Sequence, residues 1–263
     1  MIRQSLVLLA LPVAILGAQD LGSRITAVGT GTVRLQFASH EGVCGNGNSS
    51  ITVRRGDGRT THQGSVIRSG QGEWEDECEA GPVRIAVDVS RGVVTEVRAY
   101  VGGRWLGSAE RDLGHVPATE ASAYLVHLAA TADSKPAKSA LFPAMLADVP
   151  NPWRALLAIA KDADRPRDVR NSAMFWVGQA AEDAATHGLE EVIESPGDKE
   201  IRKSAVFSLS QRPKDESVPA LIRIARTHRD PELRRSAIFW LGQSRDDRAI
   251  KYFEEVLLGD GRR

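Results

Sequence analysis

The chain has 263 residues, which is room for one large or two modest domains. Lysine plus arginine and aspartate plus glutamate both total 34, so the net charge is near zero, which argues against a protein that binds nucleic acid through a general excess of cations. Aromatic residues make up only 5% of the chain, so the core must come mostly from alanine, valine, leucine and isoleucine, as in closely packed helices.

Residues 1–18 are typical of a secretory signal peptide. Arg3 supplies the basic start, residues 6–16 form an apolar run broken only by Pro12, and cleavage is expected after Ala18. The alternative is an uncleaved anchor helix, for which so short an apolar run is poorly suited. We therefore expect a secreted or periplasmic protein with no membrane span after signal removal.

The chain contains only two cysteines, Cys44 and Cys78. Because an oxidising compartment favours disulfides, we predict that these two residues are linked. The bond would close a loop of about 35 residues, worth about 3.5–4 kcal/mol in the chain-entropy model. Two free buried thiols are the alternative. Two cysteines alone are too few for a zinc site.

Residues 19–116 are rich in glycine and β-branched residues and predict a small antiparallel β module. Apolar and polar residues alternate over 33–38 and, briefly, over 51–54. The clearest signal is a hairpin, with strands over 83–89 and 93–101 joined by a short turn in which Gly92 takes a positive φ. The alternation predicts that Val93, Thr95 and Val97 share one buried face, while the opposite face is in water.

Two loops are expected between these strands. The glycine-rich stretch 42–48 is predicted to be irregular, and the predicted disulfide would tie it to the start of the hairpin. The stretch 73–79 carries five acidic residues around Trp74 and is interpreted as a solvated acidic loop. A calcium site is the alternative, although the spacing matches no calcium-binding loop.

Residues 117–263 predict an α-solenoid of about four helix pairs. The repeat is a Ser-Ala-x-Phe tetrad, and its copies recur at spacings of 33, 32 and 32 residues, which is the signature of stacked structural repeats. Each copy is followed by a helix with apolar residues at helical spacing, and prolines or glycines stand where turns are expected. The tetrads occupy residues 139–142, 172–175, 204–207 and 236–239.

The last copy carries a resemblance to a known family. Residues 230–243, Asp-Pro-Glu-Leu-Arg-Arg-Ser-Ala-Ile-Phe-Trp-Leu-Gly-Gln, resemble the short bacterial HEAT-like repeat, of the kind also found in phycobilisome lyases. The resemblance extends from about Lys135 to the C-terminus and implies a helical-repeat fold that serves many binding roles. The copies differ: Pro143 and Ser208 stand where two others have tryptophan. Because end repeats are usually atypical, the first copy is expected to act as a cap under the β module.

Two rows of residues recur once per repeat beside the tetrads. On a helical wheel, phenylalanine and the glutamine four residues later share a face away from the main apolar stripe. This face is a candidate binding surface of aromatic and amide side chains; the alternative is that phenylalanine packs between repeats and glutamine satisfies a backbone group. The candidate binding residues are Phe175, Gln179, Phe207, Gln211, Phe239, Trp240 and Gln243.

A third row contains Arg170, Arg202 and Arg234. We interpret it as a structural ladder in which each arginine pairs with acidic residues of the inter-repeat turns, and Asp168, Glu200 and Glu232 are near in sequence. The alternative is an anion-binding stripe. The structural interpretation is preferred because it explains both the period and the accompanying acidic residues.

No motif indicates an enzyme, a metal site or a cofactor. The six histidines include no HExxH pair, and the chain has no nucleophile elbow, phosphate-binding loop or dinucleotide fingerprint. Because the lyases act on a chromophore in the cytosol, their activity is not transferred to a chain with an export signal. We expect an envelope scaffold that binds a protein partner through the repeats. The alternatives are a hydrolase or lyase at the junction of module and solenoid, or a small-ligand or glycan binder that uses Trp74 or Trp105.

Overall fold

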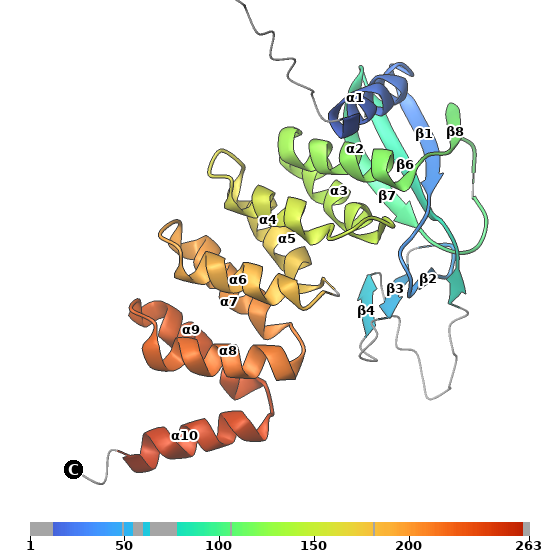
Figure 1. Ribbon diagram of the computed structural model, residues 1–263. Helices are drawn as coiled ribbons and strands as arrows, with labels where there is room; N and C mark the ends of the chain where they lie inside the picture. Colours follow the sequence, from blue (N-terminus) through green and yellow to red (C-terminus); the bar gives the residue numbers. More distant parts are fainter. Residues whose placement is uncertain are drawn as a thin grey trace, which may run out of the picture.

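The computed structural model describes residues 13–48, 50–54, 60–63, 78–105, 107–180 and 182–259. Two β-sheets form a module at the N-terminal side, and a row of stacked helices runs away from it to the C-terminus (Figure 1). The predicted α+β class, with a β module followed by a helical solenoid, is confirmed. None of the helices described is both long and apolar enough to cross a membrane.

A helix that the sequence analysis missed precedes the first strand. Helix α1 (Val13–Thr26) spans the cleavage site expected after Ala18. Its residues Leu21 and Ile25 are fully buried, and the helix packs on α2 and β6. Residues 1–12, which carry most of the predicted signal, lie outside the described residues. Leu21 and Ile25 both follow Ala18, so cleavage after Ala18 would leave these two residues in the chain.

The first sheet has the strand order β7-β6-β1-β8. Strands β1, β6 and β7 are antiparallel, whereas β8 pairs in parallel with β1, which the expected antiparallel module did not include. Helices α1 and α3 pack on this sheet and α2 packs on both of them (Figure 1). The four strands are β1 (Gly31–Phe37), β6 (Val83–Ser90), β7 (Val93–Tyr100) and β8 (Arg111–His115).

The predicted hairpin forms strands β6 and β7. Arg91 and Gly92 both have positive φ, 52° and 75°, as a tight two-residue turn between twisted strands requires. The prediction of which β7 side chains are buried is wrong at the start of the strand. Asp88 pairs with Glu96 and Val89 with Val94, so Thr95 is an extra residue in a bulge. The bulge shifts the alternation, so Val94 and Val97 are buried while Val93 and Thr95 are exposed.

The other face of β6, predicted to be in water, is covered. Arg84 and Ala86 are buried there. The segment after β7 passes over this face, and the Arg84 guanidinium donates a hydrogen bond to the carbonyl oxygen of Gly102. The predicted alternation of β6 between two faces is correct. Its second face is covered by a glycine-containing segment whose sequence has no periodic pattern that would predict this contact.

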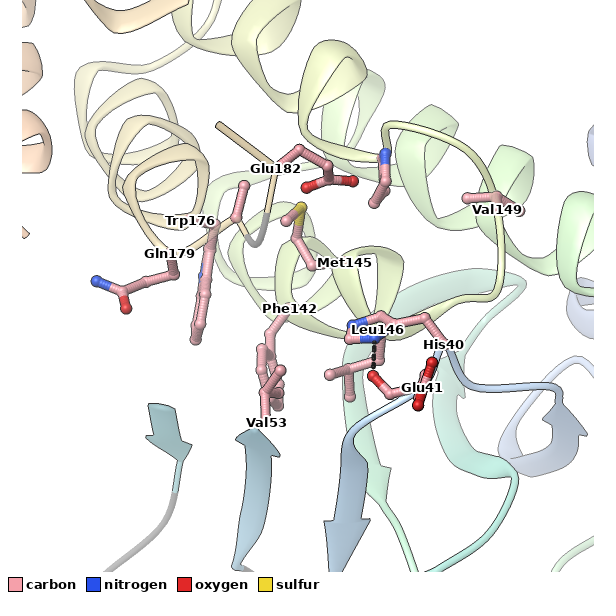
Figure 2. A pocket seen from close by; sticks show the side chains of 12 residues that line it. His40, Glu41, Val53, Phe142, Met145, Leu146, Val149, Trp176, Gln179 and Glu182 are labelled. Atoms are coloured by element: carbon pink, nitrogen blue, oxygen red, sulfur yellow. Dashed lines mark hydrogen bonds between the residues drawn. The ribbon is translucent and has the colours of Figure 1, made fainter. Parts of the chain in front are cut away.

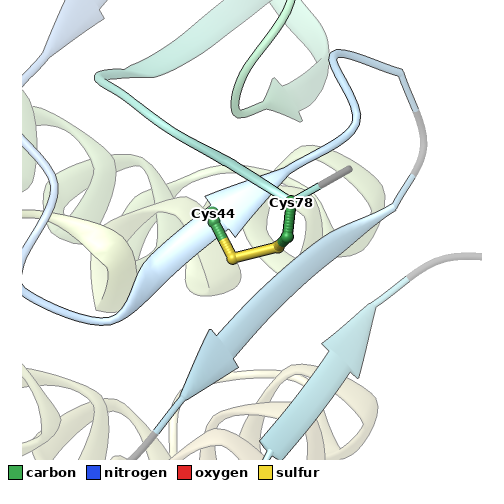
Figure 3. Close-up of a disulfide and its surroundings, with 2 residues drawn as sticks. All are labelled: Cys44 and Cys78. Carbon is green, nitrogen blue, oxygen red and sulfur yellow. A yellow bond between two sulfur atoms is a disulfide. The ribbon is translucent and has the colours of Figure 1, made fainter. Parts of the chain in front are cut away.

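The second sheet has the order β4-β3-β2-β5 and contains the disulfide between Cys44 and Cys78 (Figure 3). Strand β2 lies within the stretch 42–48 that was predicted to be irregular. A Cβ atom on Gly45 would stand 2.5 Å from the carbonyl oxygen of Val101, so glycine permits a close backbone approach here. The acidic stretch falls mostly in residues 64–77, outside the described residues. The strands are β2 (Val43–Gly45), β3 (Ile51–Arg54), β4 (Thr60–Gln63) and β5 (Glu79–Ala80).

The solenoid contains nine of the described helices. Each helix that carries a tetrad packs extensively on the helix before it, which gives the pairs α2/α3, α4/α5, α6/α7 and α8/α9, with α10 at the end. Helix α7 packs even more extensively on α5, the tetrad helix of the preceding pair. The helices are α2 (Ala118–Thr131), α3 (Ser134–Leu146), α4 (Trp153–Lys161), α5 (Arg167–Gly178), α6 (Ala184–Glu194), α7 (Lys199–Ser210), α8 (Lys214–Thr227), α9 (Pro231–Gln243) and α10 (Asp247–Gly259).

The solenoid has two layers of helices. Helices α3, α5, α7 and α9 form the layer that carries the tetrads, and the even-numbered helices form the other. Neighbouring helices pack more closely in the tetrad layer, so this layer is on the inside of the curve. Local signals start two of its helices. Asp198 accepts hydrogen bonds from the first amides of α7, and Asp230 caps α9, where Pro231 occupies the first turn.

The first tetrad helix joins the solenoid to the β module. Helix α3 packs on β7, and the amide of Val97 donates a 3.0 Å hydrogen bond to Oγ of Ser139, the first residue of its tetrad. Lys135 forms an ion pair with Glu96 at 3.0 Å. On the far side of α3, the amide of His40 donates to the carbonyl oxygen of Leu146 at 3.1 Å. The first copy thus lies against the module, as expected of a cap.

Candidate functional site

The tetrad phenylalanines belong to a continuous row of rings across four repeats. The tetrads recur at a nearly constant spacing and their helices lie side by side. The aromatic rings of one tetrad helix therefore contact those of the next. Successive centroids are 4.5, 5.1, 6.5, 5.0 and 4.9 Å apart, which is the range of favourable aromatic pairs. We call this row the aromatic ladder; its rings, in order, are Phe142, Trp176, Phe175, Phe207, Trp240 and Phe239.

Exposure increases along the aromatic ladder. Phe142 is buried against the β module, and the four central rings are partly exposed. Phe239, on the last tetrad helix, is 57% exposed. The central rings therefore pack between repeats and also present part of their surface to solvent. The ring contacts agree with the interpretation that the phenylalanines pack between repeats, while the binding surface stays a prediction.

The three glutamines follow the ladder at the ends of their helices. Gln179 lines a pocket beside Trp176, and Gln211 donates a 3.1 Å hydrogen bond from Nε2 to Oγ of Ser210. Gln243 is exposed at the end of α9. The amides thus form a second row beside the rings.

The arginine row ties neighbouring repeats together. Arg170 donates to the carbonyl oxygen of Ala160 at 3.1 Å and pairs with Asp198 at 3.0 Å. Arg202 has the same two contacts one repeat later, with the carbonyl oxygen of Ile193 at 2.9 Å and with Asp230 at 3.7 Å. The acidic partners are thus the residues that begin the next tetrad helix.

Arg234, the last arginine of the row, has different hydrogen-bond partners. Its guanidinium donates to the carbonyl oxygens of His228 and Arg229, at 2.7 and 3.1 Å. The acids that stand closest in sequence to the arginines, Asp168 and Glu232, pair instead with lysines.

A rim of ion pairs borders the aromatic ladder. Lys138 pairs with Asp168 at 2.7 Å, and Lys203 pairs with Glu232 at 2.8 Å, each joining one repeat to the next. Lys199 also contacts Glu232, and the two lysines lower the pKa of that carboxyl from 4.5 to about 2. Lys138 and Lys203 stand four positions before a tetrad phenylalanine, so the ion pairs neutralise these two charges beside the rings.

The Glu232 pairs predict a specific acid response. Because the folded-state pKa lies below the unfolded value, the stabilisation is present above about pH 4.5 and is lost as the pH falls through about 2. The Glu232→Gln variant should therefore unfold at lower urea concentration than the wild type at pH 7, and the gap should close near pH 2. Glu191→Gln, an exposed position on α6, is the control. A gap that stays constant with pH would contradict the assignment.

A pocket of about 340 Å³ lies where the ladder meets the β module. Figure 2 shows Phe142, Met145 and Trp176 on the solenoid side, with Val53 and His40 on the module side. His40 Nδ1 lies 2.7 Å from the carbonyl oxygen of Glu41, and most of the wall is apolar. Sequence reasoning missed this pocket, because it joins segments about 100 residues apart, although the first tetrad already supplied Phe142.

Metal binding was not expected from the sequence, and the described part of the chain contains no group of three or more His, Cys, Asp or Glu side chains placed to hold a metal ion. The pocket's own ionisable residues, His40, Glu41 and Glu182, come from both sides of the junction.

Comparison with known proteins identifies the repeat. Residues 186–263 match the HEAT repeats family, and this segment extends from α6 through α10. HEAT repeats are generally protein-interaction modules. No curated protein sequence matches the chain. The chain is thus similar to HEAT repeats over its C-terminal part. The ladder begins outside the matched segment, at Phe142 and Trp176, and the resemblance to phycobilisome lyases is not supported by these comparisons.

Proposed function

We propose that the chain is a non-enzymatic interaction or scaffold protein of the cell envelope, which binds a peptide segment of a partner protein along the aromatic ladder. The observation that carries this proposal is the continuity of six rings on the inner layer of the solenoid. Partly exposed aromatic rings supply large contact areas at low entropic cost and are enriched among the residues that dominate binding energies.

The charges beside the ladder favour one kind of occupant. The lysines of the rim are paired with carboxylates of the same solenoid, so the surface offers rings and amides rather than a field of one sign. These paired lysines offer little attraction to a polyanion such as nucleic acid. A peptide segment with apolar side chains suits this surface better, because its side chains can pack on the rings and its backbone groups can form hydrogen bonds with the glutamine amides.

Export is part of the proposal. Residues 1–18 are taken as a cleaved signal peptide, residues 19–116 as the β module and residues 117–263 as the repeats. The disulfide between Cys44 and Cys78 supports a secreted or periplasmic location, because such bonds persist in oxidising compartments.

The test compares two exposed apolar residues of the solenoid. Phe239 is on the ladder, whereas Leu257, on α10, is away from it and is 78% exposed. The chain from residue 19 is immobilised and incubated with an envelope fraction, and the affinity of the captured protein is then measured. Phe239→Ser should weaken binding at least tenfold, about 1.4 kcal/mol, and Leu257→Ser should leave it within twofold.

Three results would contradict the proposal. The first is equal weakening by both variants, and the second is no weakening by Phe239→Ser together with none by Phe207→Ala in a folded variant. The third is the absence of any captured protein with a folded bait. The last result would favour the alternative of a hydrolase or lyase at the junction pocket, whose lining includes His40, Glu41 and Glu182, and substrate screening would use His40→Ala as its control.

A further inference from the structure

A second hollow lies on the β module, away from the junction pocket. It is formed on the face of the first sheet opposite α1 and α3, where residues 101–105 and 107–108 pass over strands β1, β6 and β7. Its volume is about 290 Å³, near the lower end of the usual range for ligand pockets. Its lining includes four arginines and two aromatic residues: Arg34, Arg84, Arg98, Arg104, Tyr100 and Trp105.

Two of these arginines are held by Trp105. The Cζ atoms of Arg34 and Arg84 lie 4.7 and 5.1 Å from the centroid of its ring, and Tyr100 meets the same ring edge-on at 6.0 Å. Cation–π attraction of this kind is strengthened where the cation is shielded from water. Each guanidinium also donates to a carbonyl oxygen of the covering segment, Arg84 to Gly102 and Arg34 to Gly107. The cations are therefore fixed in place before any ligand arrives.

Arg84 is a charged side chain inside the protein, with only 5% of its surface exposed. Burial lowers its pKa from the usual range, and the carboxylate of Glu79 partly offsets this effect. That carboxylate also accepts a 2.7 Å hydrogen bond from the amide of Gly103. A buried cation is costly unless a group of opposite charge is close, and Glu79 offsets this cost only in part, so an anion in the hollow would be favourable for Arg84.

The other two arginines differ in their surroundings. Arg98 pairs with Asp88 at 2.9 Å, so part of its charge is already neutralised. Arg104 is exposed at the edge of the hollow. Arg34, Arg84 and Arg104 thus supply a cationic lining, in which the donors of Arg34 and Arg84 are held in a fixed geometry. Planar guanidinium groups match carboxylate and phosphate oxygens.

We propose that this hollow, the arginine–tryptophan pocket, binds a small organic anion through a phosphate or carboxylate group, with the remainder of the ligand against Trp105 and Tyr100. Its volume suits a single sugar phosphate or small organic acid rather than a polymer. No ring of the aromatic ladder lines this pocket, so either proposal can fail without the other.

The test is titration of the full chain from residue 19, monitored by Trp fluorescence and by calorimetry at constant ionic strength. The probes are glucose 6-phosphate, glucose, inorganic phosphate and benzoate, which separate the phosphate from the carboxylate source and the charge from the ring. We expect saturable binding of at least one anionic probe and none of glucose. Arg104→Gln should weaken it at least fivefold, and Trp105→Ala should weaken the organic anion more than inorganic phosphate.

The control is Arg111→Gln, which removes another exposed arginine, from β8 of the same sheet and outside the hollow. It should leave the affinity within twofold. Equal weakening by Arg104→Gln and Arg111→Gln would mean a general charge effect and would overturn the proposal. Absence of saturable binding by every anionic probe up to 10 mM, in a folded wild-type chain, would overturn it as well.

Discussion

The Arg212→Met variant is expected to unfold with a free energy about 3 kcal/mol below that of the wild type, near the lower end of the range for breaking a buried ion pair. Arg212 has only 1% of its surface exposed and lies in the turn between α7 and α8. Its guanidinium donates to Thr186 Oγ1 at 2.8 Å, to the carbonyl oxygen of Glu182 at 2.9 Å and to Glu216 at 3.0 Å. It also donates to the carbonyl oxygen of Ala180.

Methionine keeps much of the apolar stem, so the variant removes mainly the charge and the hydrogen bonds to four partners. The loss is placed at the lower end of the range because the Glu216 side chain keeps 20% of its surface in water. Urea denaturation followed by circular dichroism measures the change. The matched control is Arg223→Met, since Arg223 also pairs with a glutamate of another repeat, Glu190, but is about half exposed. Surface pairs contribute about 0–1 kcal/mol, so similar losses in both variants would refute the role of Arg212.

The Gly178→Ala variant is expected to lose about 2 kcal/mol, because it forces apart two closely packed helices. Gly178 ends α5 and faces α7. A Cβ atom at this position would stand 2.7 Å from the carbonyl oxygen of Ser208 and 2.9 Å from its Cβ atom. These distances are too short for unstrained packing, and backbone cannot rotate away as a flexible side chain can.

Gly242 provides the control, because it occupies the same place in the last tetrad helix. A Cβ atom there meets no atom within 4 Å. Gly242→Ala should therefore raise the free energy of unfolding by about 0.5 kcal/mol, since alanine favours a helix more than glycine does. Opposite signs for the two substitutions, measured by the same denaturation, are the expected result. Equal effects would show that the glycine is required for the helix end and not for packing.

The helical repeat could be predicted because its signal is periodic and local. Each tetrad helix needs the same small alanine, apolar residues and turn, so the pattern appears once per repeat in the sequence. The fold explains why Ser208 stands where two other copies of the repeat have tryptophan. The residue is fully buried against Gly178, where a large ring has no room. The sequence showed this departure but not its cause.

The features that were missed depend on contacts between distant segments. Arg212 has no counterpart in the other copies, so the periodic pattern that revealed Arg170 and Arg202 did not reveal it. Strand β8 is short and polar, and its parallel pairing with β1 joins residues about 80 positions apart. The start of α1 was read as part of a signal peptide, and nothing in its composition predicted that Leu21 and Ile25 belong to the core.

Strand β7 lies next to both proposed sites and could couple binding at one site to binding at the other. Arg98 and Tyr100 line the arginine–tryptophan pocket, and they also border a groove of about 460 Å³ whose other wall includes Phe142 and Trp176, the first rings of the ladder. A single strand thus forms a common partition between the anion and the peptide. If an anion shifts β7, the affinity for the peptide changes by some factor, and thermodynamic reciprocity requires the peptide to change the affinity for the anion by the same factor.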